Sequence, residues 1–136
     1  MSELIATTQD NFASTRARLT TALTEQGYGV LARIDLRTTL HDKLGVEHEP
    51  HEILGVCNPQ LAHQALTTDP DVALLLPCTI TLRDVDGATE VRVLDPERAF
   101  TLAAPATRDA LEPLAHDVRS RLEAVLAATV ADQTAS

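Results

Sequence analysis

The Asp86-Gly87 dipeptide is the feature that most constrains how this chain can fold. Asp-Gly is typical of the tight two-residue turn that joins neighbouring antiparallel strands. It stands between an alternating run, Val72 to Arg83, and a shorter run, Thr89 to Leu94, which Asp95-Pro96 ends. The sequence therefore predicts a β-hairpin. The apolar face of its longer strand is made by Val72, Leu74, Leu76, Cys78, Ile80 and Leu82.

Three further segments have the pattern of strands. Tyr28 to Arg37 alternates cleanly, His51 to Cys57 is a second candidate, and Glu3 to Thr8 is a weaker one. We expect the first of these to have one apolar face and one wet face. The apolar face consists of Tyr28, Val30, Ala32, Ile34 and Leu36, and the wet face of Arg33, Asp35 and Arg37.

Helical signals lie between the strands. Residues 10–26 follow a possible N-cap, Asp10 or Asn11, and stop at Gly27. A short helix from Thr38 to Gly45 and a polar loop to Pro50 come next. Asn58-Pro59 begins a helix of about ten residues, because asparagine suits the N-cap and proline the first helical position. In the last helix Pro113 marks either the start or a kink, and the apolar stripe is Leu111, Leu114, Val118, Leu122 and Val125.

This order of elements predicts an α+β fold with a single, mainly antiparallel sheet and helices packed on one face. With 136 residues, the chain is the size of one domain, residues 1–136. We expect residues 131–136 to fray. A single layer of helices leaves the other face of the sheet uncovered, and a homodimer could supply the cover.

The charge excludes some classes of partner. The formal net charge is −9, and Lys43 is the one lysine. Because nucleic-acid and anionic-lipid binding depend on clustered Lys and Arg, we expect neither. The longest apolar run, Val72 to Pro77, is too short to span a bilayer, and the first residues do not have the pattern of a signal peptide. We therefore expect a cytoplasmic protein without membrane attachment, in which a structural disulfide is not the default.

Several short motifs together resemble those of the bacterial and archaeal domain of unknown function family 302. They are Leu44-Gly45, the segment Ile53 to Ala62 with its Cys-Asn-Pro, Ala65-Leu66, the segment Leu74 to Cys78 with its Leu-Pro-Cys, Asp95-Pro96 and Gly27-Tyr28-Gly29-Val30. The resemblance covers a core of about residues 10–127. It implies a curved antiparallel sheet of the TATA-binding-protein-like class and a dimeric form. It implies no activity, no cofactor and no DNA binding, since function belongs to sites and not to folds.

Cys57 is the strongest candidate for chemistry. It directly precedes the Asn58 cap, so its sulfur is expected near free backbone N–H groups at the positive end of a helix dipole. Such an environment favours the thiolate. The alternative is that a small apolar residue is needed where a strand runs into a helix.

Cys78 differs from Cys57 because its phase in the strand matches Leu76 and Ile80. We expect it to face the core, where burial raises the pKa of a thiol and makes it inert. Pro77 cannot donate to a ladder, so this strand is expected at a sheet edge or bulged at that point. A bulge could turn Cys78 toward Cys57, and a disulfide would require Cα atoms within about 7 Å.

Metal binding is a weaker hypothesis. Cys57, Cys78, His51 and His63 are all residue types that ligate zinc or copper, but their spacings match no standard zinc motif. We therefore assign no metal ligands. A second group, consisting of His41, Asp42, Glu47, His48, Glu49, His51 and Glu52, is expected to be an exposed, solvated charge run.

The sequence contains no glycine-rich phosphate loop and no recognisable nucleophile–base pair. The leading hypothesis is therefore a homodimeric module that binds a small ligand or a protein. A thiol-based redox enzyme or sensor is the first alternative, with Cys57 as its thiol and Cys78 as a possible partner, and a metal-binding protein is the second. The predicted binding residues are Cys57, Asn58, Pro59, His63 and Cys78.

Overall fold

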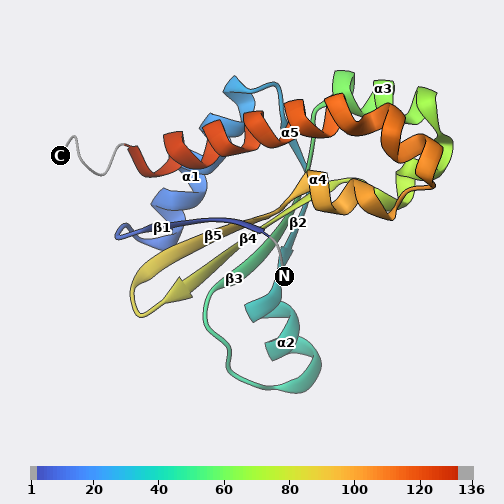
Figure 1. Ribbon diagram of the computed structural model, residues 1–136. Helices are drawn as coiled ribbons and strands as arrows, with labels where there is room; N and C mark the ends of the chain where they lie inside the picture. Colours follow the sequence, from blue (N-terminus) through green and yellow to red (C-terminus); the bar gives the residue numbers. More distant parts are fainter. Residues whose placement is uncertain (1–2, 132–136) are drawn as a thin grey trace.

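Within residues 3–131, which the computed structural model describes, five strands form one antiparallel sheet in the order β1-β5-β4-β3-β2 (Figure 1). The predicted α+β fold with a single sheet is confirmed. The strands are β1 (Glu3–Thr8), β2 (Gly29–Asp35), β3 (His51–Cys57), β4 (Cys78–Val85) and β5 (Ala88–Leu94). The predicted frayed tail falls mostly on residues 132–136, which lie outside the described residues. None of the described helices has the length and apolar character that a membrane crossing needs.

The β4–β5 hairpin forms as the Asp86-Gly87 signal predicts. Asp86 and Gly87 both have positive φ, 53° and 88°, and Val85 is paired with Ala88 across the turn. A turn of this type twists in the same sense as the strands that it joins. The sequence therefore determines the register of the centre of the sheet locally.

The predicted start of the long strand at Val72 is wrong, because β4 begins only at Cys78. Residues Pro70–Leu75 form a 3₁₀ helix, η1, whose first turn is capped by the Asp69 side chain. Val72 is 1% exposed and packs into a small core with Phe100 and Leu111, and this burial is possible only if the strand pattern is broken. The strand is also interior, not at an edge; Pro77 stands just before it and needs no partner in the ladder.

Strand β2 contains a bulge that changes which side chains share a face. Val30 is paired with Val56, whereas Ala32 is paired with Gly55, so Leu31 is the extra residue. Residues on either side of a bulge fall out of phase. The predicted apolar face of this strand is therefore wrong: Val30 shares a face with Val56, while Ala32 and Ile34 lie on the opposite face of the sheet.

Three helices cover one face of the sheet: α1 (Phe12–Glu25), α3 (Pro59–Thr68) and α5 (Pro105–Ala131) (Figure 1). Helix α5 starts before Pro113 and runs through it, although the sequence left a start or a kink open. The main core lies between these helices and the sheet. It is built from aliphatic side chains and Tyr28, including Leu19, Leu23, Leu54, Val56, Ile80, Leu82, Val91, Val93, Leu122 and Val125.

A second, smaller core closes the end of the molecule beyond the Cys57 end of β3. It joins α3, η1, α5 and the short helices α4 (Pro96–Ala99) and η2 (Phe100–Leu102). Its centre is Phe100, which is 5% exposed.

Helix α2 (Leu36–Leu44) stands apart from the other helices. Asp35 caps its first turn, Gly45 ends it with φ 68°, and none of its residues is buried. Figure 1 shows it projecting beyond the sheet, on the side away from α1, α3 and α5. The sheet therefore has a helix-covered face and an open face beside which α2 projects.

A buried carboxylate lies at the helix-covered face, where the sequence predicts a solvated charge run. Glu52 on β3 is 3% exposed and forms ion pairs with Arg16 of α1 and Arg33 of β2, at 2.6 and 2.8 Å. The expectation of an exposed Glu52 is therefore wrong. Arg33, which the sequence predicts on the solvent-exposed face of β2, forms an ion pair with this carboxylate from that position.

Candidate functional site

The two cysteines come together at neighbouring strand ends. Cys57 is the last residue of β3 and Cys78 is the first residue of β4. Val56 is paired with Cys78, so Cys57 lies one step further along the adjacent strand. Ordinary sheet spacings then separate the two Cα atoms by about 6 Å. Both cysteines are free thiols of intermediate exposure.

Both cysteines line one small, mostly apolar cavity. Its volume is about 20 Å³, room for roughly one water-sized group. The apolar part of the wall comes from β3, α3, η2 and α5 and from the residue before Pro77. These lining residues are Val56, Leu61, Ala62, Ala65, Leu76, Phe100, Leu114 and Val118.

Tyr28 and Asn58 complete the wall, and Tyr28 brings an unpaired polar group to it. The tyrosine is 4% exposed, and its hydroxyl has no hydrogen-bond partner among the described residues. A buried hydroxyl without a partner costs about 1–3 kcal/mol. The strand pattern indicates only that Tyr28 belongs to an apolar face, so its unpaired hydroxyl could not be predicted from the sequence.

Burial controls the protonation of these side chains. It raises the pKa of the Cys78 thiol to about 11, and the neighbouring Cys57 adds to this effect. Burial, followed by the proximity of Cys78, also raises the pKa of the Tyr28 phenol. At neutral pH, Cys78 is therefore mostly a thiol and Tyr28 a neutral hydroxyl, so both can donate a hydrogen bond, and Cys78 reacts as a nucleophile only through a minor thiolate fraction.

Asn58 connects the start of α3 to the end of α1. Its side-chain oxygen accepts from the Leu61 N–H at 3.3 Å and caps α3, while its Nδ2 donates to the Gln26 carbonyl at the end of α1 at 3.2 Å. Gly27 makes this possible, because a Cβ at that position would lie 2.9 Å from the Asn58 Nδ2 and the backbone has φ 84°. The predicted N-cap therefore also links two helices.

Pro59 and His63 do not line the cavity. Pro59 is the first residue of α3, and both side chains are exposed. Of the five predicted binding residues, Cys57, Asn58 and Cys78 lie together, and Pro59 and His63 lie outside the group. His63 therefore does not join the cysteines in a metal-binding set.

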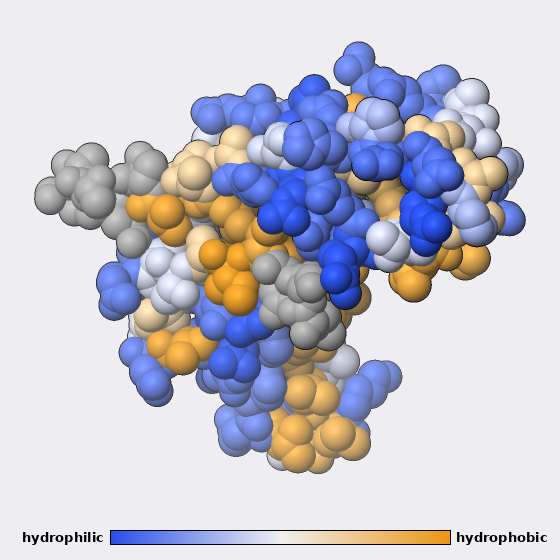
Figure 2. Space-filling model, viewed as in Figure 1, coloured by the Kyte–Doolittle hydropathy of each residue, from blue (hydrophilic) through white to orange (hydrophobic). Residues whose placement is uncertain are grey.

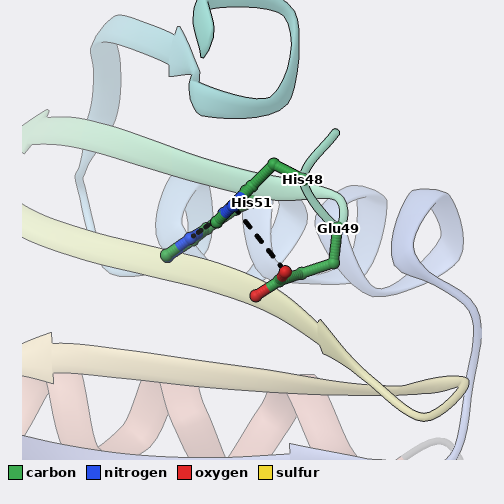
Figure 3. Close-up of side chains that lie close together, drawn as sticks. All are labelled: His48, Glu49 and His51. Carbon is green, nitrogen blue, oxygen red and sulfur yellow. Dashed lines mark hydrogen bonds and ion pairs between the residues drawn. The ribbon is translucent and has the colours of Figure 1, made fainter. Parts of the chain in front are cut away.

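A different set of metal-ligating side chains does come together, at the start of β3. Among the described residues, His48, Glu49 and His51 each offer a ligand atom, and these atoms all lie within 4.8 Å of one another. The planes of the two rings are nearly parallel, at 12° to each other, with His48 Nε2 and His51 Nδ1 3.1 Å apart (Figure 3). The Glu49 carboxylate lies 3.7 Å from His48 Nδ1. The sequence predicts a solvated charge run here, because it shows the spacing of these residues along the chain but not how closely their side chains approach one another.

The open face of the sheet carries large apolar side chains, and one row of neighbours crosses it from edge to edge. The row is Ile34, Ile53, Thr81, Arg92 and Ile5, each paired with the next. Ile5 is 51% and Ile34 is 47% exposed.

A groove of about 560 Å³ adjoins this face at Thr79 and Leu94. Leu74 and Leu102 also line it and are 89% and 79% exposed. Figure 2 shows apolar surface both on the projecting α2 region and below the end formed by α4. A larger hollow of about 770 Å³ lies between α4 and α5. Its lining residues include Glu97, Arg108, Asp109 and Glu112, and it shares Phe100 with the cavity beside the cysteines.

The comparisons with known proteins agree with this architecture. The family model described as "Domain of unknown function DUF302" matches residues 5–129, nearly the whole chain. The chain belongs to the DUF302 family. The crystal structure of an uncharacterized conserved DUF302 protein from Bacillus stearothermophilus is similar, with a TM-score of 0.86 and 28% sequence identity. The match covers 95% of this DUF302 chain and 98% of the other. No curated protein matches the sequence.

Proposed function

We propose that this DUF302 domain is a homodimeric binding module of the cytoplasm, in which a second copy covers the open face of the sheet. The observation that carries the proposal is the cross-strand row on that face, with Ile5 and Ile34 about half exposed at its two ends. Ile34 and Ile53 are paired neighbours in this row, and apolar side chains that lie together on a surface mark interaction sites, whereas isolated ones do not.

A second copy suits this face because it has an uncharged centre on β3 and β4, made by Ile53, Gly55, Thr79 and Thr81. The charged Arg83, Glu90 and Arg92 flank this centre on β4 and β5. A two-fold axis through this centre would place uncharged residues against their own copies, as an isologous contact requires. Arg92 is the charged member of the row, and Glu90 accepts from it at 2.6 Å, so packing would not bury an unpaired charge there.

Sedimentation equilibrium on the wild type and two charge-matched variants tests the dimer. Ile34→Glu places a carboxylate in the row, whereas Ala17→Glu places one on the exposed side of α1. We expect dimers for the wild type and Ala17→Glu, and monomers for Ile34→Glu. A monomeric wild type, or a dimer that Ile34→Glu leaves intact, would contradict the proposal.

The groove beside the open face is the candidate position for a small ligand. Its volume lies in the range of small-molecule sites, half of its lining residues are leucines, and Arg98 is also among them. These features suit an apolar molecule with a carboxylate. Decanoate should therefore raise the melting temperature, and decylamine should not. Leu102→Asp and Arg98→Gln should each reduce the decanoate effect, whereas equal effects of both amphiphiles would contradict a specific site.

Thiol redox chemistry is a second candidate, favoured by the convergence of Cys57 and Cys78 on one cavity. The Cys57 thiolate would attack a hydroperoxide oxygen, forming a sulfenic acid and releasing an alcohol. Cys78 would then displace water from that sulfur and form a disulfide. The Cα separation of about 6 Å from ordinary sheet spacing suits such a bond.

Intact mass spectrometry after treatment with a hydroperoxide tests this step. We expect a loss of two hydrogens in the wild type, and a mass gain of one oxygen in Cys78→Ser, where no partner resolves the sulfenic acid. An unchanged mass in the wild type, with both thiols still titratable after unfolding, would exclude the redox candidate.

A further inference from the structure

We propose that His48, Glu49 and His51 form a binding site for one divalent transition-metal ion. The inference does not rest on the proposed dimer or on the cysteines. It rests on three side chains of suitable chemistry whose ligand atoms the fold brings within 4.8 Å of one another. Imidazole nitrogens suit Zn²⁺, Ni²⁺ and Cu²⁺, and two histidines with one carboxylate form a known kind of open metal site.

The separation of the ring nitrogens is the observation that carries the proposal furthest. His48 Nε2 and His51 Nδ1 lie 3.1 Å apart. Two nitrogens that each lie 2.0–2.1 Å from one ion, at a right or tetrahedral angle, are about 2.8–3.4 Å apart. The two ring nitrogens therefore already have the separation that an ion requires, and the rings need only turn so that both lone pairs point to it.

The backbone holds the three residues in place before any ion arrives. His51 is the first residue of β3, paired with Arg83, and His48 and Glu49 come from the loop just before it (Figure 3). Both histidines are only partly exposed, so their rings have less freedom than surface side chains. A preorganised set of ligands loses less conformational entropy when it binds.

Binding would replace the hydrogen that the two rings now share. In a neutral pair, one ring nitrogen donates this hydrogen and the other accepts it. When both nitrogens bind the ion, that hydrogen moves to the far nitrogen of its ring or to solvent. The Glu49 carboxylate supplies the third ligand, and three protein ligands leave a position for water or an exchangeable anion.

One neighbouring charge opposes the ion. Arg83 lies directly across from His51, and Glu90 follows it across the sheet. The arginine repels a cation, and the two carboxylates, Glu49 and Glu90, attract it. Arg83→Gln should therefore tighten binding, on the order of 3- to 10-fold at low salt. If the ion were bound only by flexible histidines elsewhere on the surface, Arg83→Gln would leave the metal affinity unchanged.

Calorimetric titration of the intact chain with Zn²⁺ or Ni²⁺ is the test, with Mg²⁺ as the hard-cation control. We expect one Zn²⁺ or Ni²⁺ per chain and no Mg²⁺. His48→Gln and His51→Gln should each weaken binding at least about 10- to 100-fold. His63→Gln is the matched control, since this exposed histidine lies on α3, and it should bind like the wild type.

Two further measurements test whether metal binding depends on the cysteines or on dimer formation. Cys57→Ser/Cys78→Ser should bind Ni²⁺ unchanged, and Co²⁺ should give visible bands without thiolate charge transfer. Ile34→Glu should also bind one ion, whatever its oligomeric state. The proposal is overturned if His48→Gln and His51→Gln bind the metal like the wild type, or if removal of the cysteines abolishes binding. Circular dichroism is the control that each variant is folded.

Discussion

Arg33 donates to both carboxylate oxygens of Glu52 in two parallel hydrogen bonds of 2.8 Å each. Arg16 of α1 adds a third bond to the same carboxylate, at 2.6 Å. One acidic side chain on β3 thus connects the edge strand β2 to a helix on the covered face. A carboxylate that is 3% exposed depends on these partners, because burial of a charge without them is costly.

Glu52→Gln should lower the free energy of unfolding by about 1–3 kcal/mol. The amide keeps the shape but loses the charge, and Arg33 is about half exposed, so solvent limits the loss. Urea denaturation measures the change. Glu123→Gln is the control, since it removes a surface pair with Arg119 on α5 and should cost under about 0.5 kcal/mol. Equal effects of the two variants would contradict this role of Glu52.

Gly55→Ala should destabilise the domain by about 1–3 kcal/mol through overpacking. A Cβ at this position would lie 2.8 Å from the Pro77 Cγ and 3.6 Å from the Ala32 Cβ. Gly29→Ala is a matched control on the neighbouring strand, because a Cβ there would meet nothing within 4 Å. Thermal unfolding of the two variants compares them. A smaller loss for Gly55→Ala than for Gly29→Ala would show that Pro77 yields easily.

Tyr28→Phe should leave stability unchanged or raise it by up to about 1 kcal/mol. The substitution keeps the ring in the core and removes a hydroxyl that has no partner among the described residues. Chemical denaturation gives the difference. A loss above about 1 kcal/mol would mean that the hydroxyl is satisfied in solution, and the cavity beside the cysteines would then be where its partner binds.

Alkaline pH should destabilise the domain through Cys78. Its pKa rises from 9.0 to about 11 on folding, so the folded state keeps a proton that the unfolded state releases. The stabilisation is complete below pH 9 and is lost as pH rises through about 11, a change of about 2 kcal/mol. Unfolding measured from pH 8 to pH 11 should show this decline, and Cys78→Ala should reduce it. Tyr28, with its raised pKa, adds to the decline in both proteins.

The same shift predicts slow alkylation of Cys78. Two pKa units reduce the thiolate fraction about 100-fold near neutral pH. Reaction with iodoacetamide, followed by peptide mass spectrometry, should modify Cys78 far more slowly in the folded protein than in urea. Equal rates in both states would contradict the burial of this thiol.

Local patterns predicted those parts of the fold that depend on local interactions. The Asp86-Gly87 turn needs only its own backbone preference, and the Asn58 cap needs only the first turn of α3, so both could be predicted. The segment around Val72 could not, because its alternation matches a strand and only its burial against Phe100 and Leu111 overrides that pattern. Propensity is a weak guide wherever tertiary packing competes with it.

The candidate sites show the same limit. The sequence places Cys57 before a helix and Cys78 in an apolar run, but their shared cavity depends on the β3–β4 register. The unpaired hydroxyl of Tyr28 depends on which neighbours surround it. The approach of His48 to His51 depends on the path of an entire loop, which residue types do not determine.

The bulge at Leu31 has a consequence for how this protein behaves at high concentration. Strand β2 is an edge of the sheet, and it carries Val30, Leu31 and Ile34, all at least 39% exposed. A straight apolar edge with unpaired backbone groups is a template on which another chain can add a strand and begin to aggregate. The extra residue interrupts the regular spacing of those groups. Deleting Leu31 would therefore restore an uninterrupted ladder and create an aggregation-prone edge.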